Sequence, residues 1–169
     1  MAVELHRRGG DRGRRVVAHL AGVHESIARR AFEHISQSMS WPEESFSIRA
    51  HLPEHGPGLA LVAAVESDEI VETFTAFGER GIRVEAVANG LVQEIRDYLC
   101  SEAPVGEHLA DQLLPPMALA GAGAFRAIRL SRHTRTNIGT IEKFLPIRFR
   151  TRTEEENPRS GVLVEIEAL

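Results

Sequence analysis

The chain has 169 residues, 43% of them hydrophobic and 26% charged, and it carries a formal net charge of −4 at pH 7. These values are typical of one globular domain or two small ones. They exclude a polycation, so any contact with nucleic acid requires a local basic patch. The single cysteine, Cys100, excludes a disulfide framework and a cysteine-rich zinc site, and no apolar run approaches the roughly 18 residues that span a membrane. We therefore expect a protein of the reducing cytoplasm without membrane contact.

Residues 1–13 combine arginines with three glycines, and this composition has two interpretations. One is a flexible, solvated lead-in, and the other is a basic strip that contacts phosphates. We expect the flexible lead-in.

The chain from residue 14 to residue 80 predicts one helix among four strands. Ala28, Phe32, Ile35 and Met39 follow one another at helical spacing and define one face of a helix. The strands are expected over residues 14–23, 45–51, 59–66 and 70–79. The third of these is apolar on both faces, which is typical of a central strand.

The chain from residue 81 onward predicts helices and strands in alternation. The longest helix is expected over residues 83–102, where Gly90 marks possible close packing and Cys100 is expected to be a small buried side chain. Pro115 and Pro116 should end or kink the next helix, so a separate short helix is expected after them, ending at Gly121. The remaining elements are expected as a strand over 125–130, a helix over 136–145, and strands over 146–152 and 162–169.

These elements predict the order β-α-β-β-β followed by α-α-β-α-β-β. Such an order is typical of two helix-backed sheet modules, so the fold class is mixed α/β, in the broad sense that includes α+β.

His133 is the first candidate for chemistry, because it lies between a predicted strand and a predicted helix. Thr134 and Thr136 are candidate N-caps, and the free N–H groups of a helix N-terminus bind anions. From the residues alone two interpretations stay open: a solvated loop histidine, and a nucleophile aimed at a phosphate.

Asp111 and Gln112 are the second candidate, on the predicted helix over 105–114. A carboxylate and an amide suit a ribose hydroxyl or the edge of an adenine, but the same pair is common on a solvated helix face. Residues Arg148, Arg150 and Arg152 likewise form either a phosphate-facing strip or a solvated strand face. A Walker A loop, a dinucleotide-binding glycine fingerprint and a His-Glu-x-x-His zinc motif are missing from the sequence.

Two long segments, "EHLADQLLPPMALAGAGAF" and "SRHTRTNIGTIEKFLPIRF", closely resemble the C-terminal part of the RNA 3′-terminal phosphate cyclases in this order and separation. The segments "GPGLALVAAVES" and "FGERG" also look like that family. The resemblance runs from about Arg14 to the C-terminus.

The resemblance implies an enzyme, a ligase, that uses ATP to convert an RNA 3′-phosphate into a 2′,3′-cyclic phosphodiester. In the family a histidine first takes AMP from ATP, AMP passes to the RNA 3′-phosphate, and the neighbouring 2′-hydroxyl then expels it. The family's histidine falls on His133, within Ser-x-His-x-x-Thr-Asn. Mg²⁺ would offset the triphosphate charge and would be held mainly by phosphates and water, so no protein metal ligands are expected. The nucleotide-binding residues fall on His108, Leu109, Ala110, Asp111 and Gln112, together with Phe74.

This sequence departs from the family pattern in three ways. His108 stands where a tyrosine is common, Phe74-Thr75 stands where a Phe-Phe pair is common, and Pro115 adds a second proline. Stacking on the adenine would then be weaker or would come from His108 and Phe74.

The resemblance also implies a domain organisation. Residues 14–80 correspond to the family's small inserted domain and residues 81–169 to the last repeat of its catalytic domain, so the chain is expected to be a C-terminal half. Two further readings stay open. One is a non-catalytic RNA- or ribosome-associated relative, and the other is a subunit active only with a separate N-terminal half.

Overall fold

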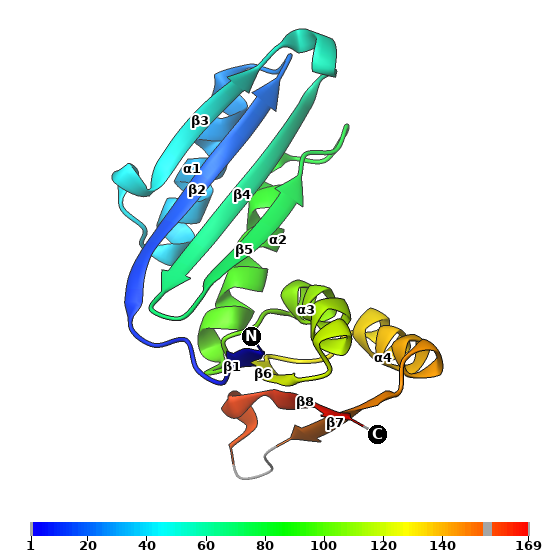
Figure 1. The fold of residues 1–169 in the computed structure, drawn as a ribbon. Helices are drawn as coiled ribbons and strands as arrows, with labels where there is room; N and C mark the ends of the chain where they lie inside the picture. Colours follow the sequence, from blue (N-terminus) through cyan, green and yellow to red (C-terminus); the bar gives the residue numbers. More distant parts are fainter. Residues whose placement is uncertain (1, 154–156, 169) are drawn as a thin grey trace. The chain divides into compact units, whose positions relative to one another are not determined.

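A computed structural model describes residues 2–153 and 157–168 of the chain (Figure 1). The chain folds into two compact units. Unit 1 comprises Met1–Gly10, Ser67–Glu72 and Tyr98–Leu169, and unit 2 comprises Asp11–Glu66 and Thr73–Asp97. The boundaries expected at residues 13 and 80 rest on composition, on the order of the predicted elements and on the family resemblance. The division into an inserted domain and a catalytic repeat therefore stays a prediction.

Unit 2 contains the helix and four strands predicted for the first half of the chain. Its elements are β2 (Asp11–Ala21), α1 (Glu25–Met39), β3 (Phe46–His51), β4 (Gly58–Ser67) except for its last residue, β5 (Val71–Phe77) from Thr73 onward, and α2 (Val84–Cys100) as far as Asp97. The strand order is β3-β2-β4-β5, so the apolar strand β4 is central, as predicted. Strands β2 and β3 run parallel, in a register that starts at Val16 opposite Phe46.

One face of the unit 2 sheet carries both helices (Figure 1). Alternate side chains of β2 and β4 point into the core, and one stripe of α1 meets them. The buried residues are Val16, Ala18, Leu20, Ala28, Ala31, Ile35, Leu61, Ala63 and Val65. The α1 stripe is the helical spacing from which this helix was predicted, whereas β2 and β4 were predicted from their runs of apolar and β-branched residues.

Two predictions made for α2 are wrong. A Cβ placed on Gly90 would meet no atom within 4 Å, so this glycine does not mark close packing. Cys100 is exposed rather than buried, because it lies at the last residue of the helix, beyond the buried stripe that includes Leu91, Ile95 and Tyr98.

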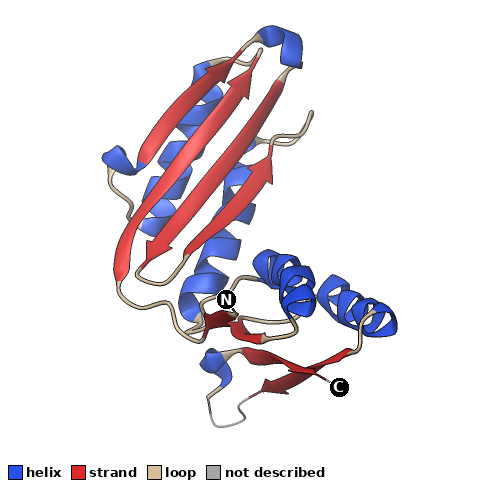
Figure 2. Cartoon of the chain, viewed as in Figure 1, coloured by secondary structure: helices blue, strands red, loops and turns tan. Residues whose placement is uncertain are grey.

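Unit 1 contains a four-stranded sheet in the order β1-β6-β8-β7, with α3 (Glu107–Ala120) and α4 (Arg132–Phe144) on one face (Figure 2). The strands are β1 (Val3–Leu5), β6 (Gly123–Ala127), β7 (Ile147–Thr153) and β8 (Val162–Ala168). Strand β8 pairs antiparallel with both of its neighbours, and β1 pairs parallel with β6. The expected flexible lead-in thus contains a strand, since Val3 and Leu5 pack against the core of unit 1.

Helix α3 continues through Pro115 and Pro116, contrary to the expectation of a break followed by a second helix. An interior proline costs about 3 kcal/mol. Both prolines are exposed, while Leu114 and Met117 are fully buried on the opposite side. Burial of two such side chains is worth a similar amount or more, since truncating each typically costs about 2–5 kcal/mol. The helix ends as predicted at Gly121, whose φ of 64° is left-handed.

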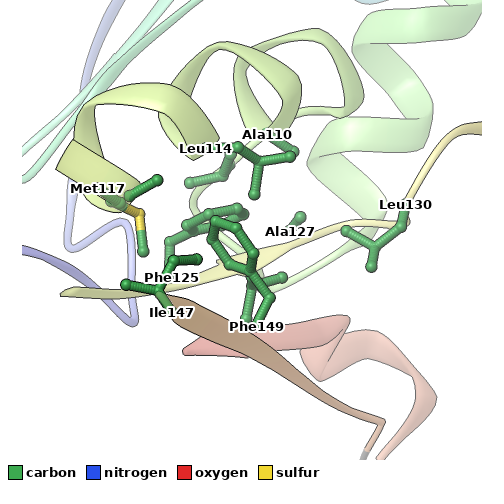
Figure 3. Close-up of a cluster of buried hydrophobic side chains, with 11 residues drawn as sticks. Ala110, Leu114, Met117, Phe125, Ala127, Leu130, Ile147 and Phe149 are labelled. Atoms are coloured by element: carbon green, nitrogen blue, oxygen red, sulfur yellow. The ribbon is translucent and has the colours of Figure 1, made fainter. Parts of the chain in front are cut away.

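The core of unit 1 lies between this sheet and α3 (Figure 3), and Ile138 and Ile141 of α4 pack against it. Leu114 and Met117 of α3 meet Phe125 of β6, and Ile147 and Phe149 of β7 close the cluster. The alternation predicted for β7 is confirmed, because Arg148 and Arg150 point to solvent. In the part of the chain that the structure describes, no helix has both the length and the apolar character needed to cross a membrane.

Candidate active site

His133 lies in the first turn of α4 rather than in the loop before it. Ser131 is the N-cap, and its Oγ accepts a hydrogen bond from the N–H of Thr134 at 3.0 Å. His133 is therefore the second residue of the helix, with an exposed side chain. The prediction that Thr134 or Thr136 caps the helix is wrong, as is the loop interpretation of His133.

The hydroxyl groups of Thr134 and Thr136 make other contacts and do not cap the helix. The Thr134 side chain is completely buried, and its Oγ1 lies 2.9 Å from the Oγ of Ser131. Thr136 donates from Oγ1 to the carbonyl of Arg132 at 2.9 Å, one turn back along the helix. The first turn of α4 is thus stabilised by a buried contact through Thr134 and by an exposed hydrogen bond from Thr136. These contacts restrict the backbone that carries His133.

The amide groups at this helix start are available to a ligand. The first intrahelical bond runs from the N–H of Arg135 to the carbonyl of Ser131. The N–H groups of Arg132 and His133 come before it and point outward along the helix axis, where they favour an anion. Arg132 and Arg135 are exposed beside them and add positive charge.

Asn137 joins the two sequence motifs. Its Nδ2 donates to Oδ1 of Asp111 on α3 at 2.7 Å, in a partly buried contact. Residues four apart lie on the same face of a helix, so His133 and Asn137 share one face of α4. The bond from that face to Asp111 brings the histidine motif and the candidate nucleotide motif together.

The prolines of α3 change the hydrogen bonding of the same motif. A proline has no N–H, so Pro115 and Pro116 cannot donate the helical bonds that would reach the carbonyl oxygens of Asp111 and Gln112. These two carbonyls are therefore acceptors that the helix itself leaves open.

The start of α3 is held by a buried carboxylate. Glu72 is 3% exposed, and its Oε2 accepts a hydrogen bond from the N–H of Gly106, the N-cap of the helix, at 3.0 Å. Burial raises the pKa of Glu72 to about 7, while the Gly106 bond and the nearby Arg8 act in the opposite direction. A second contact at this end joins Glu107 to Arg129, just before α4.

Arg8 and Tyr98 complete the surroundings of Glu72. The Arg8 guanidinium lies over the Tyr98 ring, 4.2 Å from its centroid, and donates to the Tyr98 carbonyl at 2.9 Å. The Tyr98 hydroxyl donates to the carbonyl of Pro104 at 2.9 Å. The segment before α3 is thus tied to the first residues of the chain.

The other predicted nucleotide-binding residues differ in exposure. His108 and Gln112 are exposed on α3, Leu109 is half-buried, and Ala110 is fully buried in the core, where it can only shape the helix position. Phe74 belongs to unit 2 and is 6% exposed, so its ring is covered. Only the α3 residues thus share a unit with His133.

The three arginines of β7 are exposed, in agreement with either interpretation of the strip. Arg150 donates to Glu167 of β8 at 2.7 Å, so its charge already has a partner.

The residues around His133 do not by themselves form a metal site. Within residues 2–153 and 157–168 no three His, Cys, Asp or Glu side chains gather in a way that could hold a metal ion. The carboxylate of Asp111 accepts a bond from Asn137.

Three residues of this region have contacts that were not predicted from the sequence. Asn137 lies four residues after His133, and that spacing was the clue to its position. Glu72 alternates with Phe74 on the buried face of β5, where a charged residue among apolar neighbours marks an internal partner. Arg8 was noted only as part of a basic segment, and its contact with Tyr98 could not be predicted because the two residues are 90 positions apart.

The comparisons with known proteins identify the family of the chain. The family model of the RNA 3′-terminal phosphate cyclases matches residues 13–151, which include both motifs. The chain belongs to the RNA 3′-terminal phosphate cyclase family.

Curated relatives of the chain are named RNA 3′-terminal phosphate cyclase. A Ralstonia nicotianae RNA 3′-terminal phosphate cyclase is 43% identical over 155 residues, which cover 92% of this chain and 44% of the relative. A Pseudomonas fluorescens cyclase is 39% identical over 91% of this chain and 45% of its own length. A Salmonella enteritidis cyclase is 51% identical over 66% of this chain and 32% of its own length. The chain thus spans less than half the length of these relatives.

Proposed function

We propose that this chain carries the nucleotidyl-transfer part of an ATP-dependent RNA 3′-phosphate cyclase, with His133 as the residue that takes AMP. The observation that carries the proposal is the Asn137–Asp111 bond, which joins the histidine motif to the candidate nucleotide motif one turn after His133. Family membership supports the reaction class.

In the first step a ring nitrogen of His133 attacks the α-phosphorus of ATP. A P–N bond forms, the bond between the α-phosphorus and the bridging oxygen breaks, and pyrophosphate leaves with that electron pair. A covalent nucleophile divides a difficult displacement into easier steps. The exposed position of His133 gives the ring access to such a substrate.

The first turn of α4 would stabilise the phosphate during this transfer. The N–H groups of Arg132 and His133 point toward incoming negative charge, and the Ser131 cap keeps them in place. The exposed Arg132 and Arg135 would add longer-range attraction.

The nucleoside would lie along α3. Asp111 and Gln112 provide a carboxylate and an amide, and their carbonyl oxygens lack the helical bonds that Pro115 and Pro116 cannot donate. The exposed His108 could stack on the base, whereas Phe74 would first have to be uncovered. Mg²⁺ would enter with the ATP phosphates.

In the later steps AMP passes to an RNA 3′-phosphate, and the adjacent 2′-hydroxyl displaces AMP to close the cyclic phosphodiester. RNA with a 3′-phosphate end is therefore the proposed substrate. The proposed protein partner is a separate N-terminal half of the cyclase, which would supply the part of the family's chain that this sequence does not match. We also propose that residues 14–80 are the inserted domain and 81–169 the last catalytic repeat, in a cytoplasmic protein.

A chimera tests this function without depending on what the chain does alone. In the Ralstonia nicotianae relative, the matched region would be replaced by this chain, and cyclisation of an RNA 3′-phosphate would be measured. We expect ATP-dependent cyclisation that is lost in the His133→Ala chimera and kept in a His51→Ala control. A folded chimera without cyclisation would instead favour a non-catalytic relative.

A further inference from the structure

Unit 2 has a groove that the proposed chemistry does not use. It lies between α1 and the sheet-edge strand β3, and its volume is about 660 Å³. Its lining consists of Glu25, Arg29, Phe32, Glu33 and Ser36 of α1, Glu43, and Phe46, Ser47 and Ile48 of β3.

The groove runs along the edge of the sheet rather than over one of its faces. Neighbouring residues of a strand point to opposite faces, yet Phe46, Ser47 and Ile48 all line it. The α1 residues that line it lie at positions 25, 29, 32, 33 and 36, which form one stripe along three turns of the helix.

Strand β3 is a free edge of its sheet. In the strand order β3-β2-β4-β5 its pairing partner is β2, and the outward-facing side has no strand partner among the described residues. Every second backbone N–H and C=O of such a strand points outward and can pair with an added chain. Between Phe46 and His51 the strand contains no proline, which is the residue that would block this pairing.

The floor of the groove is apolar. The rings of Phe32 and Phe46 lie 5.0 Å apart between centroids, and both side chains, like that of Ile48, are only half-buried. Alternate side chains of an added strand would point toward this floor, so apolar residues would be favoured at every second position.

The rim of the groove is acidic. The charged residues that line the groove are three carboxylates and one guanidinium, namely Glu25, Glu33, Glu43 and Arg29. Arg29 pairs with Glu25 at 3.2 Å, and Glu33 accepts a bond from the neutral amide of Gln37 at 3.3 Å. Among the described residues no cationic side chain pairs with Glu33 or Glu43, so their negative charge is left for a cationic ligand, and the same charge disfavours RNA.

We propose that this groove binds an extended peptide segment of alternating apolar and basic residues, which adds to the sheet as a strand beside β3. The α1 stripe from Glu25 to Ser36 is about 16 Å long at 1.5 Å per residue. An extended chain covers that length with about five residues. The partner is thus a protein segment with lysine or arginine at every second position.

The probe is a fluorescein-labelled peptide of alternating lysine and valine, about six residues long, with blocked ends. Binding to the full chain would be measured by fluorescence anisotropy, and amide NMR shifts would locate it. Two control peptides carry glutamate in place of lysine, or N-methyl groups on alternate amides that prevent strand pairing. We expect binding of the lysine peptide alone, with shifts along β3 and the α1 stripe.

The protein variants distinguish the effect of the carboxylates that line the groove from the effect of a nearby carboxylate outside it. Glu33→Lys with Glu43→Lys should weaken binding at least about tenfold, a loss of about 1.4 kcal/mol. Glu44→Lys, next to the groove but outside its lining, should change affinity less than twofold by comparison. Circular dichroism would verify that each variant is folded.

Several results would overturn the proposal. They are failure of the lysine peptide to bind, equal binding of the N-methylated or glutamate peptide, and equal loss in the Glu44→Lys control. A concentration-dependent dimer of the chain whose contact shifts lie on β3 would assign the edge to a second copy instead. Displacement of the peptide by a short RNA that shifts the same β3 amides would assign it to nucleic acid.

Discussion

Asn137 of α4 donates a hydrogen bond to Asp111 of α3 over 2.7 Å, and this bond links the two helices one turn after His133. The bond is partly buried, and its acceptor is charged, which makes it stronger than a neutral hydrogen bond at the surface. The orientation of the His133 face toward the candidate nucleotide motif therefore depends on this pair.

A double-mutant cycle measures the strength of the pair. Asp111→Ala and Asn137→Ala should each lower the free energy of unfolding by about 1–2 kcal/mol, and the double variant should lose less than the sum, with a coupling of about 1 kcal/mol. Urea denaturation of the chain gives these values. Strict additivity of the two single losses would show that the bond does not hold the helices together.

The cap of α4 gives a second prediction. Ser131→Ala should lower the free energy of unfolding by about 1 kcal/mol, because the N–H of Thr134 loses its acceptor. Ser131→Asp should restore most of the loss. Thr140→Ala is the matched control, since the Thr140 hydroxyl only donates back to the carbonyl of Thr136 on the exposed side. A Ser131→Ala variant as stable as the original chain would contradict the assignment of Ser131 as the cap.

Glu72 should make stability depend on pH. Its pKa is raised from an ordinary 4.5 to about 7, mainly by burial, so between these values the folded chain binds more protons than the unfolded chain. The free energy of unfolding contributed by this group is therefore highest below pH 4.5 and falls as the pH rises to about 7. Arg8 and Tyr98 are the other titratable groups around it, and both keep their charge states across this range.

Glu72→Gln should remove this part of the slope, whereas the exposed control Glu69→Gln should keep it. Denaturation at a series of pH values measures the slope, and the amide NMR shift of Gly106, which donates to Glu72, should titrate with a midpoint near 7. A Gly106 shift that does not change between about pH 5 and about pH 8, on either side of that midpoint, would show that Glu72 does not titrate there.

Two glycine substitutions should act in opposite directions. Gly90→Ala should raise the free energy of unfolding by about 1 kcal/mol, because alanine favours the helix and its Cβ would meet nothing within 4 Å. Gly106→Ala should lower it by about 1–3 kcal/mol, because the Cβ would lie 2.5 Å from Oε1 of Glu72. Thermal unfolding compares the two. A stabilised Gly106→Ala variant would mean that Glu72 does not approach the helix start.

Much of the fold could be predicted from local patterns. The α1 stripe from Ala28 to Met39 and the alternation of Ile147 and Phe149 reflect burial of one face, which is written into the sequence as a period. The relation of His133 to a helix start was also predictable, because polar residues that cap helices cluster around it.

The features of the fold and the site that were not predicted depend on contacts between residues that are distant in the chain. The strand Val3–Leu5 forms because β6, about 120 residues later, offers it an edge. The prolines of α3 are tolerated because the core on the other side of the helix outweighs their cost. The Asp111–Asn137 bond needed the packing of two helices, which no spacing within one helix specifies.

The most direct test of the central claim is the chemical identity of the AMP acceptor. The chimera with the Ralstonia nicotianae relative would be incubated with ATP and Mg²⁺ without RNA, digested, and mapped by mass spectrometry for AMP-bearing peptides. We predict one adduct, on His133, with an acid-labile P–N bond that is absent from the His133→Ala chimera. An adduct on another residue, or one that persists in the His133→Ala chimera, would contradict the assignment of His133 as the nucleophile.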